Sequence, residues 1–388
     1  MQFRFFSPVA GLLGLGLLLL SLASASAQLF ETKAAQAFMI DAETGTVLFA
    51  KDADKPIPPA SMAKLMTMEV VFNAIKSGRM TLGDTFVVSE NAWRTGGAPS
   101  GTSTMFAKLK SAVSVGDLIQ GVTVQAANDG CIVLAEGMAG SEANFAAQMT
   151  ERARQLGLQK STFVNATGLP ADGQQTTVRE LALLALHLWR DYPEFFRYYG
   201  QPEFTWNKIT QRNRNPLLAM GIGADGFVAG TSEAAGFGIV GTVSHNGTRV
   251  IAAMSGLASD RERSEEARKL LDWGSRSFEK TEIFAKDEVV GEAAVFGGAK
   301  SGVALKAKGP VEIFLPIANR DRLTAKIVYD GPVSAPVEAG QPVGALRVWI
   351  GDTLSQETPL FAAESVGVGT LPQRALDAAK ELAVGWLR

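Results

Sequence analysis

The spacing of hydrophobic positions predicts strands first and helices next along the chain. Residues 37–40 and 47–49 are short apolar runs on either side of a turn that contains Gly45, a pattern typical of a β-hairpin. From 61 to 75, apolar residues fall on nearly every helical face, which predicts a helix buried on most sides. Helical patterns continue from 116 to 186, with interruptions at Gly, Asp and Asn.

Strand patterns then return. Residues 239–243 and 249–252 are apolar runs on either side of Asn246-Gly247, a dipeptide that strongly favours a tight hairpin turn. Residues 261–278 follow with the pattern of an amphipathic helix. Strands, then helices, then strands again predict an α+β fold in which distant parts of the chain share one layer.

After about residue 280 the pattern changes to short Val- and Ile-rich runs separated by turns with Gly and Pro. This pattern predicts a small all-β domain over 280–368. The runs are Val289–Val290, Ala293–Val295, Val303–Leu305, Val311–Leu315, Lys326–Tyr329 and Gly344–Trp349.

The last segment, residues 369–388, is predicted to be an amphipathic helix from Leu371 onwards. Its apolar face comprises Leu376, Ala379, Leu382, Ala383, Trp386 and Leu387. Such a helix can lie on a membrane surface, and a peripheral membrane contact through 371–388 is one expectation. The alternative is a helix docked on its own protein.

The N-terminus has the three parts of a secretory signal peptide: a positive start at Arg4, an apolar stretch at 12–22, and Ala-Ser-Ala at 25–27. We therefore predict that residues 1–27 are a signal peptide. The alternative is a membrane anchor, but the apolar stretch is shorter than the roughly 20 residues that a spanning helix needs. The mature chain is expected to be exported.

Composition narrows the chemistry further. The formal net charge is −2, with 37 basic and 39 acidic residues, so nothing favours nucleic-acid binding. A single cysteine, Cys131, excludes an intramolecular disulfide, and we interpret it as a helix-packing residue. Two histidines, His187 and His245, make a multi-histidine metal centre improbable, so neither a metal nor a cofactor is expected.

The segment Pro58-Pro59-Ala60-Ser61-Met62-Ala63-Lys64 carries the candidate chemistry. Residues three apart on a helix are neighbours, so Ser61 and Lys64 share a face. A serine hydroxyl becomes a good nucleophile when a base removes its proton, and a lysine with a lowered pKa is such a base. The start of a helix also offers backbone N–H groups to a developing oxyanion.

The Ser-x-x-Lys pattern alone is common, and a second match occurs at 277–280, which we interpret as the surface end of a helix. The simpler interpretation of Ser61 is an ordinary N-cap. No histidine is placed to serve a Ser-His-Asp triad: His187 fits helix packing, and His245 falls in the predicted hairpin turn.

The wider context resolves the ambiguity, because the chain resembles the low-molecular-mass penicillin-binding proteins, serine-type D-alanyl-D-alanine carboxypeptidases. The resemblance covers nearly the whole mature chain. Its pieces are Pro59–Thr67, Val88–Trp93, Asn128-Asp129 with Ala135-Glu136, Leu156–Leu158, Asn165–Leu169, Asn213–Leu218, and the β-rich and helical segments after 280.

The resemblance implies a transpeptidase domain of the penicillin-binding/β-lactamase-like fold over 28–279, an antiparallel sheet with helices. The small all-β domain and the amphipathic helix would follow it. It also implies a periplasmic location, with peptidoglycan stem peptides and β-lactams as partners. Ser61 would attack the bond between two terminal D-alanines with Lys64 as base, the N–H groups of Ser61 and Thr231 would form the oxyanion hole, and Asn128 would hold substrate amides.

Two of the family's motifs are altered. Its Ser-x-Asn motif is here Ala126-Ala127-Asn128, without the hydroxyl that relays a proton to the leaving amine. Its Lys-Thr-Gly motif is here Val228-Ala229-Gly230, without the groups that meet the substrate's terminal carboxylate. Charge-assisted hydrogen bonds are worth about 1.5–3 kcal/mol each, so these losses predict reduced turnover.

Three hypotheses stay open. The first is a carboxypeptidase acting through Ser61 at a reduced rate. The second is a catalytically impaired relative that binds cell-wall peptide or another protein as a scaffold. The third is a related serine hydrolase for peptides without a free carboxylate, which would suit the apolar Val228.

Overall fold

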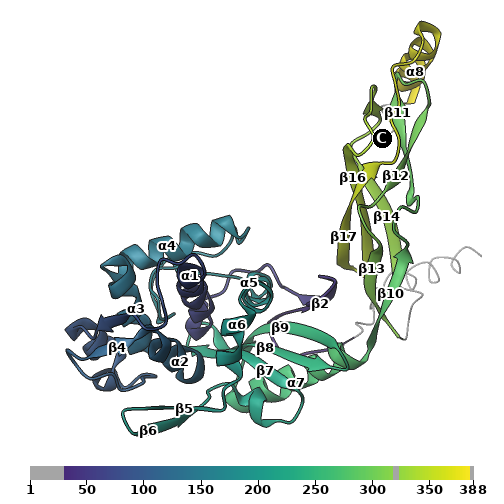
Figure 1. Cartoon of the computed structure of the whole chain (residues 1–388). Coiled ribbons are helices and arrows are strands. Elements are labelled where there is room, and N and C mark those ends of the chain that lie inside the picture. The colour runs from purple at the N-terminus through teal and green to yellow at the C-terminus, as the bar shows by residue number, and fades with distance from the viewer. Residues whose placement is uncertain (1–29, 318–322, 385–388) are drawn as a thin grey trace, which may run out of the picture. The chain divides into compact units, whose positions relative to one another are not determined.

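The computed structural model describes residues 30–317 and 323–384 (Figure 1); the predicted signal peptide, 1–27, lies outside the described residues. The part of the chain from residue 36 to residue 257 contains a five-stranded antiparallel sheet with the strand order β2-β1-β9-β8-β7. The strands are β1 (Gln36–Asp41), β2 (Val47–Lys51), β7 (Ala224–Ser232), β8 (Gly236–His245) and β9 (Thr248–Leu257). The N-terminal hairpin thus pairs, through β1, with a strand more than 200 residues further on, which confirms the α+β prediction.

Both faces of this sheet are covered. Strands β8 and β9 are buried at six consecutive positions, 238–243 and 250–255, and consecutive residues of a strand point to opposite faces. The predicted hairpin between them is confirmed, since Asn246 and Gly247 have φ angles of 50° and 82°, as a type I′ turn requires.

Helices lie against the sheet and fill the segment between its strands (Figure 1). Helix α7 packs on β8 and β9, and α5 packs on β1 and β9. Side chains of Ser114, Ser141, Thr177 and Ser259 cap four of the helices by accepting backbone N–H groups. The α-helices are α1 (Lys64–Lys76), α2 (Val115–Gln125), α3 (Asn128–Ala139), α4 (Glu142–Gln155), α5 (Val178–Asp191), α6 (Pro193–Phe196) and α7 (Asp260–Arg276).

Shorter elements connect them. Two hairpins are formed by β3 (Thr85–Val87) with β4 (Ala112–Ser114) and by β5 (Glu203–Trp206) with β6 (Ile209–Arg212). The single-turn helices are η1 (Ala60–Ala63), η2 (Ala92–Gly96), η3 (Ala98–Ser100), η4 (Arg197–Gly200) and η5 (Pro216–Ala219).

The predicted helix 261–278 is two residues too long. Helix α7 ends at Arg276, and Phe278 is the first residue of β10, where it pairs with Pro316. The apolar pattern extended the predicted helix too far because Phe278, although it belongs to the strand, still packs edge-on against Trp273 of the helix, with 4.9 Å between the ring centroids. The second Ser-x-x-Lys match, 277–280, accordingly spans a helix end and a strand.

The all-β prediction for the following segment is confirmed. Six strands form one sheet in the order β14-β16-β17-β12-β11-β15, and β10 pairs with β13. These strands enclose a second core of mainly Val, Leu and Ile side chains. They are β10 (Phe278–Phe284), β11 (Gly291–Phe296), β12 (Gly302–Lys306), β13 (Val311–Pro316), β14 (Leu323–Tyr329), β15 (Val333–Ser334), β16 (Pro342–Ile350) and β17 (Thr353–Ala362).

One predicted run in this region is wrong. Val289–Val290 precedes β11 and belongs to no strand, with Val289 half exposed and Val290 packed on the core. A run of only two apolar residues cannot show whether the segment forms a strand or only places a side chain in the core.

The C-terminal helix α8 spans Leu371–Val384, and residues 385–388, with the predicted apolar Trp386 and Leu387, lie outside the described residues. Leu371, Leu376 and Leu382 are 58–86% exposed. Within the described part of the chain, no helix is both long enough and apolar enough to cross a membrane.

Candidate active site

Ser61 and Lys64 lie together where η1 runs into α1. The Lys64 Nζ is 3.1 Å from the Ser61 Oγ, so the predicted neighbourhood of the pair is present in the structure. Lys64 is only 2% exposed, and burial lowers the pKa of its amine below the usual 10.5. A buried amine with a lowered pKa beside a serine hydroxyl is suited to take up the hydroxyl proton.

A loop that is distant in sequence holds this pair. The carbonyl oxygen of Thr167 accepts a second hydrogen bond from Lys64 Nζ at 2.5 Å, across a separation of 103 residues. Asn165 fixes the loop, because its Oδ1 accepts from the N–H groups of Thr167 and Gly168. The loop also packs very closely on η1: a Cβ added to Gly168 would lie 1.8 Å from the carbonyl oxygen of Ala60.

The edge strand β7 forms the next wall of the site. A Cβ added to Gly230 would lie 2.9 Å from the Ser61 backbone nitrogen, so only glycine permits this approach of β7 to η1. Gly230 of the predicted third motif therefore lies directly beside Ser61. Val228 is buried, and Ala229 faces the cavity described below.

The altered second motif occupies the junction between α2 and α3. Ala126 ends α2 in the left-handed conformation, with φ at 52°, and Asn128 begins α3. Asn128 is 4% exposed; its Nδ2 donates to Thr102 Oγ1, and its Oδ1 has no hydrogen-bond partner among the described residues. A buried acceptor without a partner is consistent with a group that receives a ligand's N–H.

The loop opposite this junction brings in Ser103. Its carbonyl oxygen accepts from the Asn128 backbone N–H at 2.7 Å. The next residues of the loop are fixed by the buried Asp129, whose carboxylate accepts from Thr104 Oγ1 and from the N–H groups of Met105 and Ala107. Burial raises the pKa of this carboxyl group.

These walls enclose a cavity of about 260 Å³ with Ser61 on its surface. Of the predicted site residues, Ser61, Ala126, Ala229, Gly230 and Thr231 line it, whereas Lys64 lies buried behind Ser61, and Asn128 and Val228 are not part of the lining. The sequence interpretation did not single out four further lining residues, Ser103, Arg214, Asp260 and Arg263. Of these four, only Arg214 could have been noticed from the sequence, because it belongs to Asn213–Leu218, one of the segments that carry the family resemblance.

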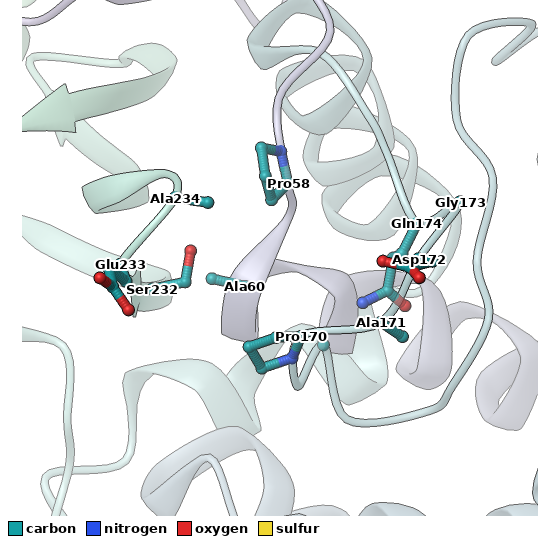
Figure 2. Close-up of a pocket in the computed structure, with 11 residues that line it drawn as sticks. Pro58, Ala60, Pro170, Ala171, Asp172, Gly173, Gln174, Ser232, Glu233 and Ala234 are labelled. Atoms are coloured by element: carbon teal, nitrogen blue, oxygen red, sulfur yellow. The ribbon is translucent and has the colours of Figure 1, made fainter.

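A larger cavity of about 620 Å³ adjoins the same two segments. Its lining includes Ala60, which precedes Ser61, and Ser232, which follows Thr231. In Figure 2 Ala60 lies between the turn with Glu233 on one side and the loop with Asp172 on the other. The charged side chains in its lining are both acidic.

Cys131 does not take part in this chemistry. It is fully buried in α3, and burial raises the pKa of its thiol to about 12. A thiol that stays protonated is a poor nucleophile, which supports its interpretation as a packing residue.

An antiparallel sheet carrying helices, with a Ser–Lys pair beside its edge strand, places the protein in the class of penicillin-binding serine enzymes. Comparison with protein families agrees. Residues 22–258 match the model described as D-alanyl-D-alanine carboxypeptidase, and residues 278–368 match the C-terminal domain of penicillin-binding protein 5. The chain belongs to the D-alanyl-D-alanine carboxypeptidase family.

Individual relatives cover most of the chain. D-alanyl-D-alanine carboxypeptidase DacC of Escherichia coli is 37% identical over 85% of this chain and 84% of its own length. DacD of Salmonella typhimurium is 37% identical over 87% of this chain and 88% of its own.

Solved structures show the same fold. Penicillin-binding protein 5 from Haemophilus influenzae has a TM-score of 0.72 at 31% identity, covering 87% of this chain and 98% of its own. Penicillin-binding protein D2 from Listeria monocytogenes, solved in a cefotaxime-bound form, has a TM-score of 0.55 at 28% identity, covering 63% of this chain and 98% of its own.

Proposed function

We propose that the protein is a serine-type D-alanyl-D-alanine carboxypeptidase of peptidoglycan metabolism, which removes the terminal D-alanine of stem peptides through an acyl-enzyme on Ser61. The observation that carries the proposal is the 3.1 Å contact between Ser61 Oγ and the buried Lys64 amine. Family membership and the names of the relatives support the substrate class.

The reaction divides into two acyl transfers. Lys64 Nζ takes the proton of Ser61 Oγ, which bonds to the carbonyl carbon between the two D-alanines. The backbone N–H groups of Ser61 and Thr231 are proposed to hold the oxyanion. The C–N bond then breaks, the leaving amine of D-alanine takes up a proton that originates from Lys64, and water hydrolyses the ester on Ser61.

The proton transfer to the leaving amine is the slow point in this proposal. The family's second-motif hydroxyl would carry that proton, and Ala126 has none. Asn128 keeps its proposed contact to substrate amides through the unpaired Oδ1. Together with the changed third motif, Val228 and Ala229, this predicts an attenuated enzyme.

The alternative is a catalytically impaired homologue that binds cell-wall peptide as a scaffold. The observation in its favour is that Ala126 and Ala229 line the cavity beside Ser61 but, like Val228, carry neither a hydroxyl nor a charge. This alternative predicts that phenotypes of a deletion strain are rescued by Ser61→Ala.

Export to the periplasm is part of the proposal, supported by the N-terminal pattern and by the relatives named above. β-Lactams are the expected inhibitors, since a relative of the same fold was solved with cefotaxime. The peripheral membrane contact of residues 371–388 stays a prediction.

Labelling with a fluorescent penicillin tests the proposal. We expect the wild-type chain to be labelled slowly and the Ser61→Ala variant to carry no label. Ser89→Ala is a matched control, because Ser89 likewise lies at a short helical segment, where its Oγ accepts from the Ala92 N–H, but it is outside the cavity lining. A wild-type chain that stays unlabelled after prolonged incubation would refute acylation at Ser61 and favour the scaffold.

A further inference from the structure

The cavity beside Ser61 contains hydroxyl groups although the second motif has none at Ala126. Among the residues that the structure describes, three with a hydroxyl line this cavity: Ser61, Ser103 and Thr231. Ser61 is the proposed nucleophile. The Oγ1 of Thr231, on β7, already accepts a hydrogen bond from Arg263 Nη1 at 3.3 Å. Ser103 therefore has the hydroxyl that remains available for another role.

Two hydrogen bonds attach the loop of Ser103 to the second motif. The backbone N–H of Asn128 donates to the Ser103 carbonyl oxygen at 2.7 Å. The Asn128 Nδ2 donates at 3.0 Å to the Oγ1 of Thr102, the residue before Ser103. The backbone and the side chain of Asn128 thus both hold this loop against the junction between α2 and α3, two residues from Ala126.

Thr104, the residue after Ser103, is fixed by α3 as well. It is 5% exposed, and its Oγ1 donates to the buried carboxylate of Asp129 at 2.6 Å. Its carbonyl oxygen accepts from Gln211 Nε2 of β6 at 3.1 Å. Ser103 therefore lies between two residues whose side chains are bonded to the first two residues of α3, so the position of Ser103 does not depend on its own hydroxyl.

The Ser103 hydroxyl is not used by the fold. It makes no hydrogen bond to any residue that the structure describes, and Ser103 is half-buried at the surface of the cavity that Ser61 and Ala126 also line. A hydroxyl is both a donor and an acceptor, so it can give up one proton while it takes up another. This is the property that Ala126 lacks.

We infer that the Ser103 hydroxyl carries the proton to the leaving amine, in place of the hydroxyl that the second motif lacks at Ala126. This inference rests on the proposed function. As the C–N bond breaks and the oxyanion returns to a carbonyl, the electron pair of that bond stays on the nitrogen, which takes the proton of Ser103 Oγ. The proton that Lys64 Nζ took from Ser61 then replaces it, by way of a water molecule in the cavity. This longer route agrees with the attenuated turnover proposed above.

The test compares two substrates with the same acyl peptide and the same terminal carboxylate: an amide ending in D-Ala-D-Ala, and the thioester in which thiolactate replaces the last D-alanine. A thiol has a pKa of about 8.5, so a thiolate can leave without being protonated, whereas the amine of D-alanine cannot. The measured quantity is kcat/KM, which reports acylation by either substrate. Ser103→Ala should lower the amide-to-thioester ratio of kcat/KM by about 10²-fold and leave the thioester value nearly unchanged.

A second variant tests whether one hydroxyl replaces the other. Adding Ala126→Ser to Ser103→Ala should return the ratio to the wild-type value or above, because a hydroxyl then stands at the motif position. Ser111→Ala is the matched control. Ser111 lies on the same segment between η3 and β4, but its hydroxyl bonds the Lys108 carbonyl and it is outside the cavity lining, so the ratio should not change.

An equal fall for both substrates in Ser103→Ala would overturn the inference, because it would indicate a structural role. An unchanged ratio would overturn it as well, and so would a fall that Ala126→Ser does not reverse. Failure of the wild-type chain to react with either substrate would instead refute the proposed function.

Discussion

The two halves of the proposed active-site cleft differ in the side chains that they present. The half formed by η1 and α1 holds the two proposed reactive groups, with Ser61 and Lys64 in contact and Lys64 bonded to the Thr167 carbonyl. The half formed by β7 and the α2–α3 junction presents Ala126 and Ala229 to the cavity, and these side chains carry neither a hydroxyl nor a charge. The comparison separates what the backbone of this site provides from what its side chains provide, and variants can test the two contributions one at a time.

The largest effect is expected in the half formed by η1 and α1. Lys64→Ala removes the base and should slow acylation of Ser61 by about 10²- to 10⁴-fold, measured with penicillin under pseudo-first-order conditions. Lys76→Ala is the control, since Lys76 lies on the same helix but bonds the Asp191 carbonyl at the surface. If the Lys64→Ala variant were acylated at the wild-type rate, Lys64 would not be the base that activates Ser61.

Changing the half formed by β7 and the α2–α3 junction should have the next largest effect, in the opposite direction. The triple variant Ala126→Ser, Val228→Lys, Ala229→Thr should release D-alanine from a pentapeptide ending in D-Ala-D-Ala about 10²-fold faster than the wild type, because it regains a relay and two carboxylate contacts. A rate unchanged by reversion would mean that the lost side chains do not limit turnover. Activity in the revertant alone would favour the scaffold.

The backbone contribution of β7 can be tested separately. Gly230→Ala places a methyl group 2.9 Å from the Ser61 nitrogen, which should push β7 away from η1. We expect slower acylation and a loss of stability of about 1–3 kcal/mol, measured by urea denaturation. Gly83→Ala, whose added methyl would meet only a side-chain oxygen at 3.9 Å, should leave both unchanged.

The pH dependence of acylation gives a further check of the half formed by η1 and α1. Burial lowers the pKa of Lys64, so the neutral, basic form appears at a lower pH than in an ordinary lysine. The acylation rate should therefore rise with pH and reach its plateau below pH 10.5. Between the lowered pKa of Lys64 in the folded protein and its ordinary pKa of 10.5, the unfolded chain binds more protons than the folded one. The contribution of Lys64 to the free energy of unfolding therefore increases as pH rises through this range. A rate that still climbs at pH 10.5 would contradict this assignment.

The smallest effect is expected from Cys131. This thiol faces the same buried region as Lys64 but stays protonated, so Cys131→Ala should alter acylation less than the Lys64, Gly230 and triple variants above. Its cost should be about 1 kcal/mol of stability from the smaller side chain. A strong fall in acylation without loss of stability would assign the thiol a chemical role.

Much of the fold was predictable because local signals agreed with it. Asn246-Gly247 fixed the β8–β9 hairpin, and the apolar run after Ser61 matched a helix buried on most sides. The helix end at Arg276 was not predictable, since Phe278 is apolar in either a helix or a strand. The sheet order was likewise beyond local patterns, because β1 pairs with a strand 200 residues away.

The candidate site also has a part that was predictable from the sequence and a part that was not. Three-residue spacing placed Ser61 beside Lys64, since a helix dictates that contact. The contribution of Thr167 could not be read from its sequence, because it acts through a backbone carbonyl. Arg263 appeared only as one polar residue of an amphipathic helix, and nothing local distinguishes it from the exposed Arg261. Residues that act from distant elements become visible only when those elements are packed together.

The fit of Gly168 and Gly230 around η1 has a consequence for how the protein gains its activity. The contacts around Ser61 join segments more than a hundred residues apart, so we expect the proposed nucleophile to be completed only when these long-range contacts form. Covalent capture by penicillin would then report the completed native chain and ignore partly folded forms. The rate at which label appears during refolding would time the last docking step of the domain.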